Sequence, residues 1–206
     1  MTAYASADTS RDQSLIAAAE RGDVPAVQRL LRDGASIAVR DTRGRTALLA
    51  ATHGNQVEAA RLLIAAGADV NAKDAIEDSP FLYAGAEGRN EILKLTLAAG
   101  ADLKSTNRYR GTALIPAAHH GHVETVKILL ATPIDKDHVN RLGWTALLEA
   151  VILGDGGPAH TKIVRLLVSA GANVNIVDRD GVTPLAHARQ RGHAAIVRIL
   201  QDASAK

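Results

Sequence analysis

Histidines gather in one short stretch, "AHHGH", which gives His119, His120 and His122 the residue types of a metal site. A helix turns about 100° per residue, so the adjacent His119 and His120 point to different sides and do not easily share one ion. His122 follows a helix-ending Gly, a position that His193 also occupies and that usually has a structural role. We therefore expect no metal site.

A carboxylate and a histidine suffice for acid–base chemistry, and Glu149, Asp155 and His160 lie close together in the sequence. Nothing in the pattern orients them, so we assign no catalytic residue and expect a protein that is not an enzyme and has no cofactor. The nearby "GDGGP", residues 154–158, is not a phosphate-binding loop, because no strand precedes it and no Gly-Lys-Ser/Thr follows. The absence of cysteine excludes disulfides, thiolate nucleophiles and Cys-ligated zinc.

The composition limits the possible partners. The 206 residues carry a net charge of +2, which is too small to indicate a nucleic-acid or membrane-surface protein. The longest apolar runs have about ten residues, against the roughly 20 that span a bilayer. The sequence starts without the basic and apolar stretches of a secretory signal. We expect a cytoplasmic protein, or a periplasmic one if a signal peptide has been removed.

The elements that carry these residues repeat along the chain. The residue that opens each "TAL"-type stretch recurs after 33, 33, 33, 33 and 38 residues, at Gln13, Thr46, Ser79, Thr112, Thr145 and Thr183. An apolar position further on recurs after 33, 33, 33, 38 and 33 residues, at Leu30, Leu63, Thr96, Leu129, Leu167 and Leu200. The two series place five extra residues in the fifth unit. Such a period predicts one supersecondary unit per repeat, stacked on its neighbours to form a continuous core.

Each unit predicts two short helices followed by a turn. The first helix begins at a Ser or Thr that can cap its N–H groups and ends at a Gly. The second is more apolar, and a turn such as "DTRG" or "DRDG" leads to the next unit. Pro133 replaces a Gly and cannot take a positive φ, so the fourth unit must end differently. Thr96 replaces a core Leu, and we expect its hydroxyl to bond back to a carbonyl.

The stretches "GRTALLAATHGNQVEAARLLIAAGADVNAKD" and "DGVTPLAHARQRGHAAIVRIL" resemble ankyrin repeats, and the whole chain is similar to small stand-alone bacterial ankyrin repeat proteins. The resemblance implies an all-α solenoid of six stacked helix-turn-helix units with β-turn fingers, in which the first and last units act as caps. We expect a flexible segment, residues 1–10, before a single repeat domain, residues 11–203. The expected repeats are 11–40, 41–73, 74–106, 107–139, 140–177 and 178–203.

Two features depart from the family pattern. The family's T-P-L-H motif lacks its His in every unit, so the residue that ties the finger to the helix is missing. The fifth unit carries the insertion at 154–158, after its first helix. Two interpretations of the insertion remain open. It could form a longer helix and a flexible turn, since added loop length costs little, or it could form a loop that contacts a partner.

The resemblance implies a protein–protein interaction module that binds another protein on the concave face formed by the fingers and the first helices. We expect a monomer. Tyr, Trp and Arg most often dominate binding energy, and several of them fall on this face in units three to five. The expected partner-binding residues, with one from the inserted loop, are Tyr83, Arg108, Tyr109, His119, His120, Arg141, Trp144, Glu149 and Asp155.

The sequence allows three alternatives to protein binding. The first is a small-molecule or catalytic site beside the 154–158 loop, and the second is structural self-association through an exposed end. The third is phosphate contact by the finger arginines, but acidic residues lie in the same fingers and the net charge is only +2. We therefore expect no nucleic-acid partner and no membrane partner. The finger arginines are Arg40, Arg43, Arg45, Arg108, Arg110, Arg141 and Arg179.

Overall fold

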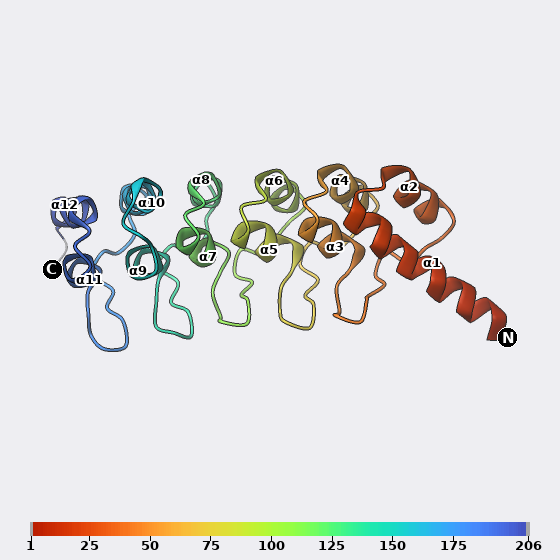
Figure 1. Ribbon diagram of the computed structural model, residues 1–206, viewed down its shortest axis with the longest axis horizontal. Helices are drawn as coiled ribbons and strands as arrows, with labels where there is room; N and C mark the ends of the chain where they lie inside the picture. Colours follow the sequence, from red (N-terminus) through yellow and green to blue (C-terminus); the bar gives the residue numbers. More distant parts are fainter. Residues whose placement is uncertain (1, 205–206) are drawn as a thin grey trace. The chain divides into compact units, whose positions relative to one another are not determined.

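The computed structural model describes the backbone of residues 2–204 and the side chains of residues 10–204. Within residues 2–204 every regular element is an α-helix, and the helices are joined by turns and long loops (Figure 1). The chain divides into two compact units. Unit 1 contains the residues up to Ala84 together with Glu91–Asp102, and unit 2 contains Gly85–Asn90 and the chain from Leu103 onward. The grouping of residues 11–203 into a single domain stays a prediction.

Unit 1 is built on two helix pairs. Helix α1 packs against α2 and α3, and α4 packs against α2 and α3. Helix α1 begins at Thr2, within the segment 1–10 that we expected to be flexible, where Ala3, Ala5 and Ala7 favour helix. The helices are α1 (Thr2–Arg21), α2 (Val24–Arg32), α3 (Ala47–His53) and α4 (Val57–Ala65), and α5 (Pro80–Ala86) and α6 (Asn90–Ala98) contribute to both units.

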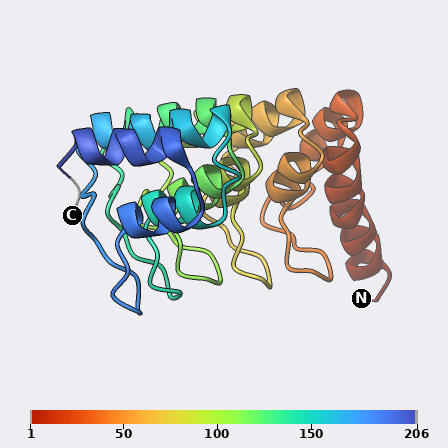
Figure 2. The same cartoon turned by 60° about the vertical axis from the view of Figure 1, so that its left-hand side comes forward.

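Unit 2 continues the same pattern with three helix pairs. Each first helix packs against its partner and against the first helix of the next pair, and the second helices also pack against one another. Two layers of helices result, and the long loops extend from one side of them (Figures 1 and 2). The helices are α7 (Leu114–His119), α8 (Val123–Leu130), α9 (Ala146–Ile152), α10 (Pro158–Ser169), α11 (Pro184–Gln190) and α12 (Ala194–Asp202).

Side-chain caps hold the start of most first helices, as predicted. The confirmed caps, each of which accepts the N–H three residues further on, are Thr46, Ser79, Thr145 and Thr183. Thr112 differs, because the Ile115 N–H donates to its carbonyl at 3.2 Å and its buried hydroxyl has no partner. Pro116 has no N–H to donate to that carbonyl, so the first turn tightens and α7 begins only at Leu114.

The structure confirms both predicted departures in the second helices. The Thr96 side chain is fully buried, and its hydroxyl donates to the Leu93 carbonyl at 2.9 Å. Helix α8 ends without the positive-φ glycine that follows α6 and α10. Instead, the N–H and the hydroxyl of Thr132 both donate to the Leu129 carbonyl, at 3.0 and 2.6 Å. The hydroxyl supplies a donor at the point where Pro133 has none.

The five extra residues of the fifth repeat lengthen its second helix. Helix α9 has 7 residues, the same as α3 and α11. Helix α10 has 12 residues, against 9 in α4 and 8 in α8. Pro158 opens α10, a position that suits its fixed φ and missing N–H. Of the two interpretations left open, the longer helix is present as α10, and residues 153–157 form the loop before it.

Candidate functional site

A repeated hydrogen-bond pattern shapes the loops, or fingers, that precede α3, α5, α7, α9 and α11. In each finger one side-chain oxygen accepts the N–H groups two and four residues further on. The backbone N–H of the same residue donates to the carbonyl four residues on, which closes the turn. The predicted turn chemistry is thus confirmed. The residues that supply the oxygen are Asp41, Asp74, Asn107, Asn140 and Asp178.

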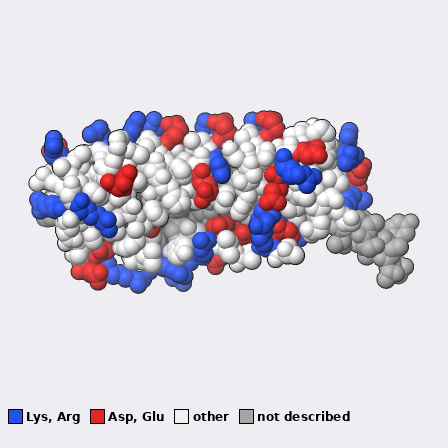
Figure 3. Space-filling view, viewed as in Figure 1, with Lys and Arg blue, Asp and Glu red and all other residues white. Residues whose placement is uncertain are grey.

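The fingers of unit 2 bring together one exposed tyrosine and three arginines. The guanidinium carbons of Arg108 and Arg141 lie 4.9 and 5.0 Å from the centre of the Tyr109 ring, within the range of cation–π attraction. The Arg141 N–H donates to the Tyr109 carbonyl at 2.9 Å, and a guanidinium N–H of Arg179 donates to the Arg141 carbonyl. We call Arg108, Tyr109, Arg141 and Arg179 the finger patch. Figure 3 shows Lys and Arg side chains gathered along the lower edge below α7 and α9, where these fingers lie.

The arginines of the two units differ in what neutralises them. In unit 1 the Arg45 guanidinium is buried and lies 2.8 Å from both Glu20 and Asp41, and Arg43 lies 3.8 Å from Glu20. In unit 2, Arg141 and Arg179 form no ion pair with any carboxylate in the described part of the chain. The positive charges of Arg141 and Arg179 are therefore open to an external anion.

A buried polar cluster lies behind the finger that precedes α9. The Asn140 amide N–H donates to a Glu149 carboxylate oxygen at 2.8 Å, while its oxygen accepts the N–H groups of Leu142 and Trp144. The other Glu149 oxygen lies 3.5 Å from Nδ1 of His119. Asn140 and Glu149 are 5% and 6% exposed, so neither presents a surface to a partner. The cluster fixes the backbone that carries Trp144.

Burial dominates the electrostatics of this cluster. It raises the pKa of the Glu149 carboxyl to about 7 and lowers the pKa of the His119 imidazole. A carboxyl with a pKa near neutrality is a property of acid–base catalysts, and it is also the ordinary consequence of desolvation. Here burial alone raises the pKa, and the hydrogen bond from Asn140 acts against it, so packing accounts for the shift.

Hydrogen bonds tie the inserted loop back to the neighbouring helix pair. Nδ1 of His160 lies 2.8 Å from a carboxylate oxygen of Asp155, and Nε2 donates to the His119 carbonyl at 2.9 Å. The Gly157 N–H donates to the same Asp155 oxygen at 2.8 Å, and this bond is the largest cause of the lowered Asp155 pKa. Asp155 is exposed, whereas the His160 side chain is 12% exposed, so of this pair only Asp155 lies open to a partner.

Replacing Asp155 by Ala is expected to loosen the loop without unfolding the protein. Residues 153–160 should exchange their amide hydrogens faster, because the Gly157 N–H loses its acceptor and His160 loses its contact with the Asp155 carboxylate. Hydrogen-exchange mass spectrometry would measure this, with Asp202→Ala, an exposed change in α12, as the control. Unchanged exchange in the loop would show that Asp155 does not hold it.

The remaining predicted residues take no part in the contacts around the Tyr109 ring. His120 is exposed, and its Nδ1 donates to the Ala86 carbonyl at 2.8 Å. Trp144 is half-buried and closes the finger turn that precedes α9, where its N–H donates to the Asn140 side chain. Tyr83 belongs to unit 1, where its ring stacks on His53 at 3.8 Å. The structure thus brings together Arg108, Tyr109 and Arg141, and joins Glu149 to His119.

The family's His is absent as the sequence shows, but in two repeats another pair of residues ties the finger to its helix. In the sixth repeat Nε2 of His187 lies 2.7 Å from Asp178, and in the fifth repeat the Asn140 side chain donates a hydrogen bond to Glu149. In each pair the two residues are nine positions apart in the sequence. The helix residue of each pair, His187 or Glu149, directly follows the position at which the family has His. A search for complementary polar pairs at this spacing would have found Asn140, which the sequence analysis did not single out.

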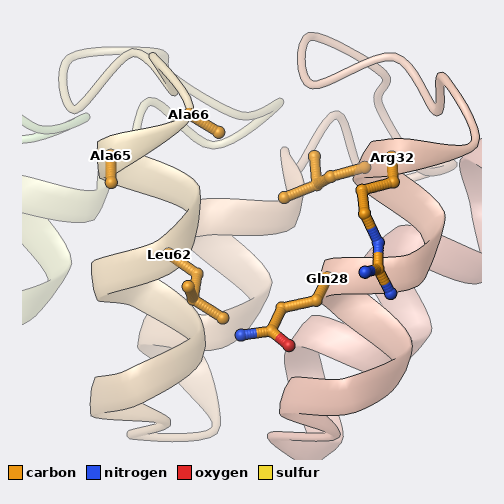
Figure 4. A pocket seen from close by; sticks show the side chains of 6 residues that line it. Gln28, Arg32, Leu62, Ala65 and Ala66 are labelled. Atoms are coloured by element: carbon orange, nitrogen blue, oxygen red, sulfur yellow. The ribbon is translucent and has the colours of Figure 1, made fainter.

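A hollow of about 520 Å³ lies between α2 and α4 in unit 1. Its polar lining residues are Gln28 and Arg32, and the rest of the lining is aliphatic (Figure 4). It contains none of the predicted site residues and no carboxylate or histidine. Within the described residues, no three His, Asp or Glu side chains are placed to hold a metal ion. The hollow therefore offers space but no acid–base chemistry.

Comparison with known proteins places this geometry in a family. The sequence pattern described as "Ankyrin repeats (3 copies)" matches residues 4–74, 81–178 and 135–206. The chain belongs to the ankyrin repeat family. The predicted class, an all-α solenoid of ankyrin repeats, is confirmed, and its twelve described helices are compatible with six repeats.

Three solved ankyrin repeat structures are similar to the chain. A domain from Acinetobacter baumannii AYE has a TM-score of 0.90 and 57% identity, covering 93% of this chain and 98% of that one. The ankyrin repeat protein EF0377 has a TM-score of 0.89 and 44% identity, covering 92% and 97%. The ankyrin repeat domain of Bcl-3, a member of the IκB protein family, has a TM-score of 0.84 and 30% identity, covering 94% and 86%.

A shorter match joins the chain to YahD of Escherichia coli (strain K12), which is named as an ankyrin repeat protein. The two are 44% identical over 57 residues, and the chain covers 28% of the length of YahD. Ankyrin repeats are in general protein–protein interaction modules, and ankyrin repeat proteins are in general non-catalytic scaffolds. Among the described residues, none of the helices has the length and apolar character needed to cross a membrane.

Proposed function

We propose that this ankyrin repeat protein is a non-catalytic module that binds another protein through the finger patch of unit 2, flanked by Trp144. The observation that carries the proposal is the placement of two guanidiniums over one exposed tyrosine ring. Tyr109 is 40% exposed, and gathering cations around it gives no folding benefit that we can identify. Tyrosine and arginine are the residues that most often dominate the energy of an interface.

Rigid support strengthens the proposal. Each finger turn is closed by two side-chain bonds and one backbone bond, and the fingers before α7 and α9 are joined by the bond between Arg141 and Tyr109. A preformed surface loses less conformational entropy when it binds, which favours affinity. The expected contacts His119, His120 and Asp155 also belong to unit 2 and are not buried.

A catalytic role for Glu149 is the second candidate, and it rests on the carboxyl pKa of about 7 beside His119. A catalytic acid must reach its substrate, and Glu149 is 6% exposed with both oxygens facing Asn140 and His119. We favour binding because the finger patch is already exposed to a partner, whereas Glu149 would have to become exposed before it could reach a substrate.

The test uses two variants with equal loss of charge. Immobilised wild type, Arg108→Ala/Arg141→Ala and Arg165→Ala/Arg198→Ala would be exposed to lysate of the source organism, and the retained proteins identified by mass spectrometry. Arg165 and Arg198 are exposed on α10 and α12, outside the fingers. A partner that binds through the finger patch should lose at least about tenfold in affinity with the first variant only. Equal retention by all three proteins would refute the proposal.

A further inference from the structure

We infer that the finger patch recognises an acidic protein segment, whose carboxylates lie against Arg108, Arg141 and Arg179. The inference rests on the proposed function and names the kind of partner. These three arginines occupy the same position in three consecutive fingers, because they are separated by 33 and 38 residues, the spacings of their repeats. The same position in the two fingers of unit 1 holds Thr42 and Ala75. The row of arginines is therefore a feature of unit 2.

Contacts within the patch hold the row ready for anions. Tyr109 draws two guanidiniums towards one ring, although like charges repel, and Arg179 is anchored to the Arg141 carbonyl. No described carboxylate forms an ion pair with Arg141 or Arg179. The planar guanidinium donates two parallel hydrogen bonds to a carboxylate, so side chains of Asp or Glu fit the row directly. Binding would relieve the repulsion between the arginines.

Nearby residues favour a protein segment over nucleic acid. Leu142 and Tyr109 are 41% and 40% exposed beside the arginines, and they offer apolar contact to side chains between the acidic ones. Asp180 lies exposed next to Arg179, where it would repel a continuous phosphate backbone. The whole chain carries a net charge of only +2, so a long-range field for nucleic acid is lacking.

Fluorescence anisotropy with a fluorescein-labelled octaglutamate peptide would test the inference. At about 50 mM salt, where charges are weakly screened, we expect saturable binding to wild type and none of an octaglutamine peptide. Arg108→Ala/Arg141→Ala/Arg179→Ala should lower the affinity at least about tenfold, since a pair of parallel hydrogen bonds between a guanidinium and a carboxylate is strong. Lys162→Ala/Arg165→Ala/Arg198→Ala removes the same charge from α10 and α12 and should lower it less than about threefold.

Three outcomes would overturn the inference. Equal loss in the two triple variants would show non-specific attraction, and tighter binding of an eight-nucleotide oligothymidylate than of octaglutamate would indicate nucleic acid. The third outcome is an absence of octaglutamate binding while a lysate partner still depends on Arg108 and Arg141. In that case the proposed function stands and only the acidic nature of the partner is wrong.

Discussion

Glu149→Gln is expected to change the free energy of unfolding more favourably at pH 8 than at pH 4, by about 3 kcal/mol. Burial raises the pKa of this carboxyl from an ordinary 4.5 to about 7. The favourable contribution of the neutral form is complete below pH 4.5, where folded and unfolded states are both protonated. It is lost as the pH rises through about 7, because the folded protein must then hold a buried carboxylate. Gln keeps the acceptor for Asn140 and has no charge to bury.

Urea unfolding followed by circular dichroism at pH 4, 5, 6, 7 and 8 would measure this difference. Glu124→Gln, the same change at an exposed residue, is the control and should give a much flatter difference. His119 has a lowered pKa, so the stability that it contributes is lost as the pH falls. Each variant must therefore be compared with wild type at the same pH. A difference that does not vary between pH 4 and pH 8 would mean that Glu149 does not titrate near neutrality.

Arg45→Ala is expected to lower the free energy of unfolding by about 2–3 kcal/mol, whereas Arg141→Ala should change it by less than about 0.5 kcal/mol. The Arg45 guanidinium is bound by Glu20 at 2.8 and 3.2 Å and by Asp41 at 2.8 Å, and the residue is 3% exposed. Its loss removes the shortest ion pairs between α1 and the finger before α3, and it leaves Asp41 and Glu20 only the more distant Arg43, at 3.9 and 3.8 Å. Arg141 lies exposed, so its loss costs binding rather than stability.

Acid should shrink the effect of Arg45→Ala. The hydrogen bond from Arg45 is the largest cause that holds the Glu20 pKa below its ordinary value. The contribution of this pair is present above pH 4.5 and is lost as the pH falls through the lowered pKa, because Glu20 then becomes neutral. Urea unfolding at pH 7 and pH 3 would measure the change. An equal loss of stability in Arg45→Ala and Arg141→Ala at pH 7 would contradict the distinction between the two arginines.

The repeat pattern was predictable because its determinants are local. Cap residues such as Thr46 and Thr183 bond to N–H groups three residues away, and the finger Asp and Asn residues bond to groups two and four residues away. The back-bond of Thr96 reaches only Leu93. Thr112 failed as a cap for an equally local reason, the missing N–H of Pro116, which the sequence shows.

The candidate site was predictable only in part. Register placed Arg108, Tyr109 and Arg141 on neighbouring fingers, and their contacts around one ring bear this out. Register also placed Glu149 on an exposed face, yet it lies buried beside Asn140. The direction of a helix side chain and the extent of its burial depend on how the neighbouring repeat packs against it.

The sequence by itself determined the family, the helix pairs, the finger turns and the place of the insertion, because period, capping and turn chemistry act over a few residues. Only the tertiary structure decided which residues are neutralised or buried. Arg45 and Arg141 look alike in sequence, but Glu20, 25 residues before Arg45, neutralises the first, and no described carboxylate neutralises the second. Such contacts join different repeats, and they form only when packing has fixed the distance and direction between side chains far apart in the chain.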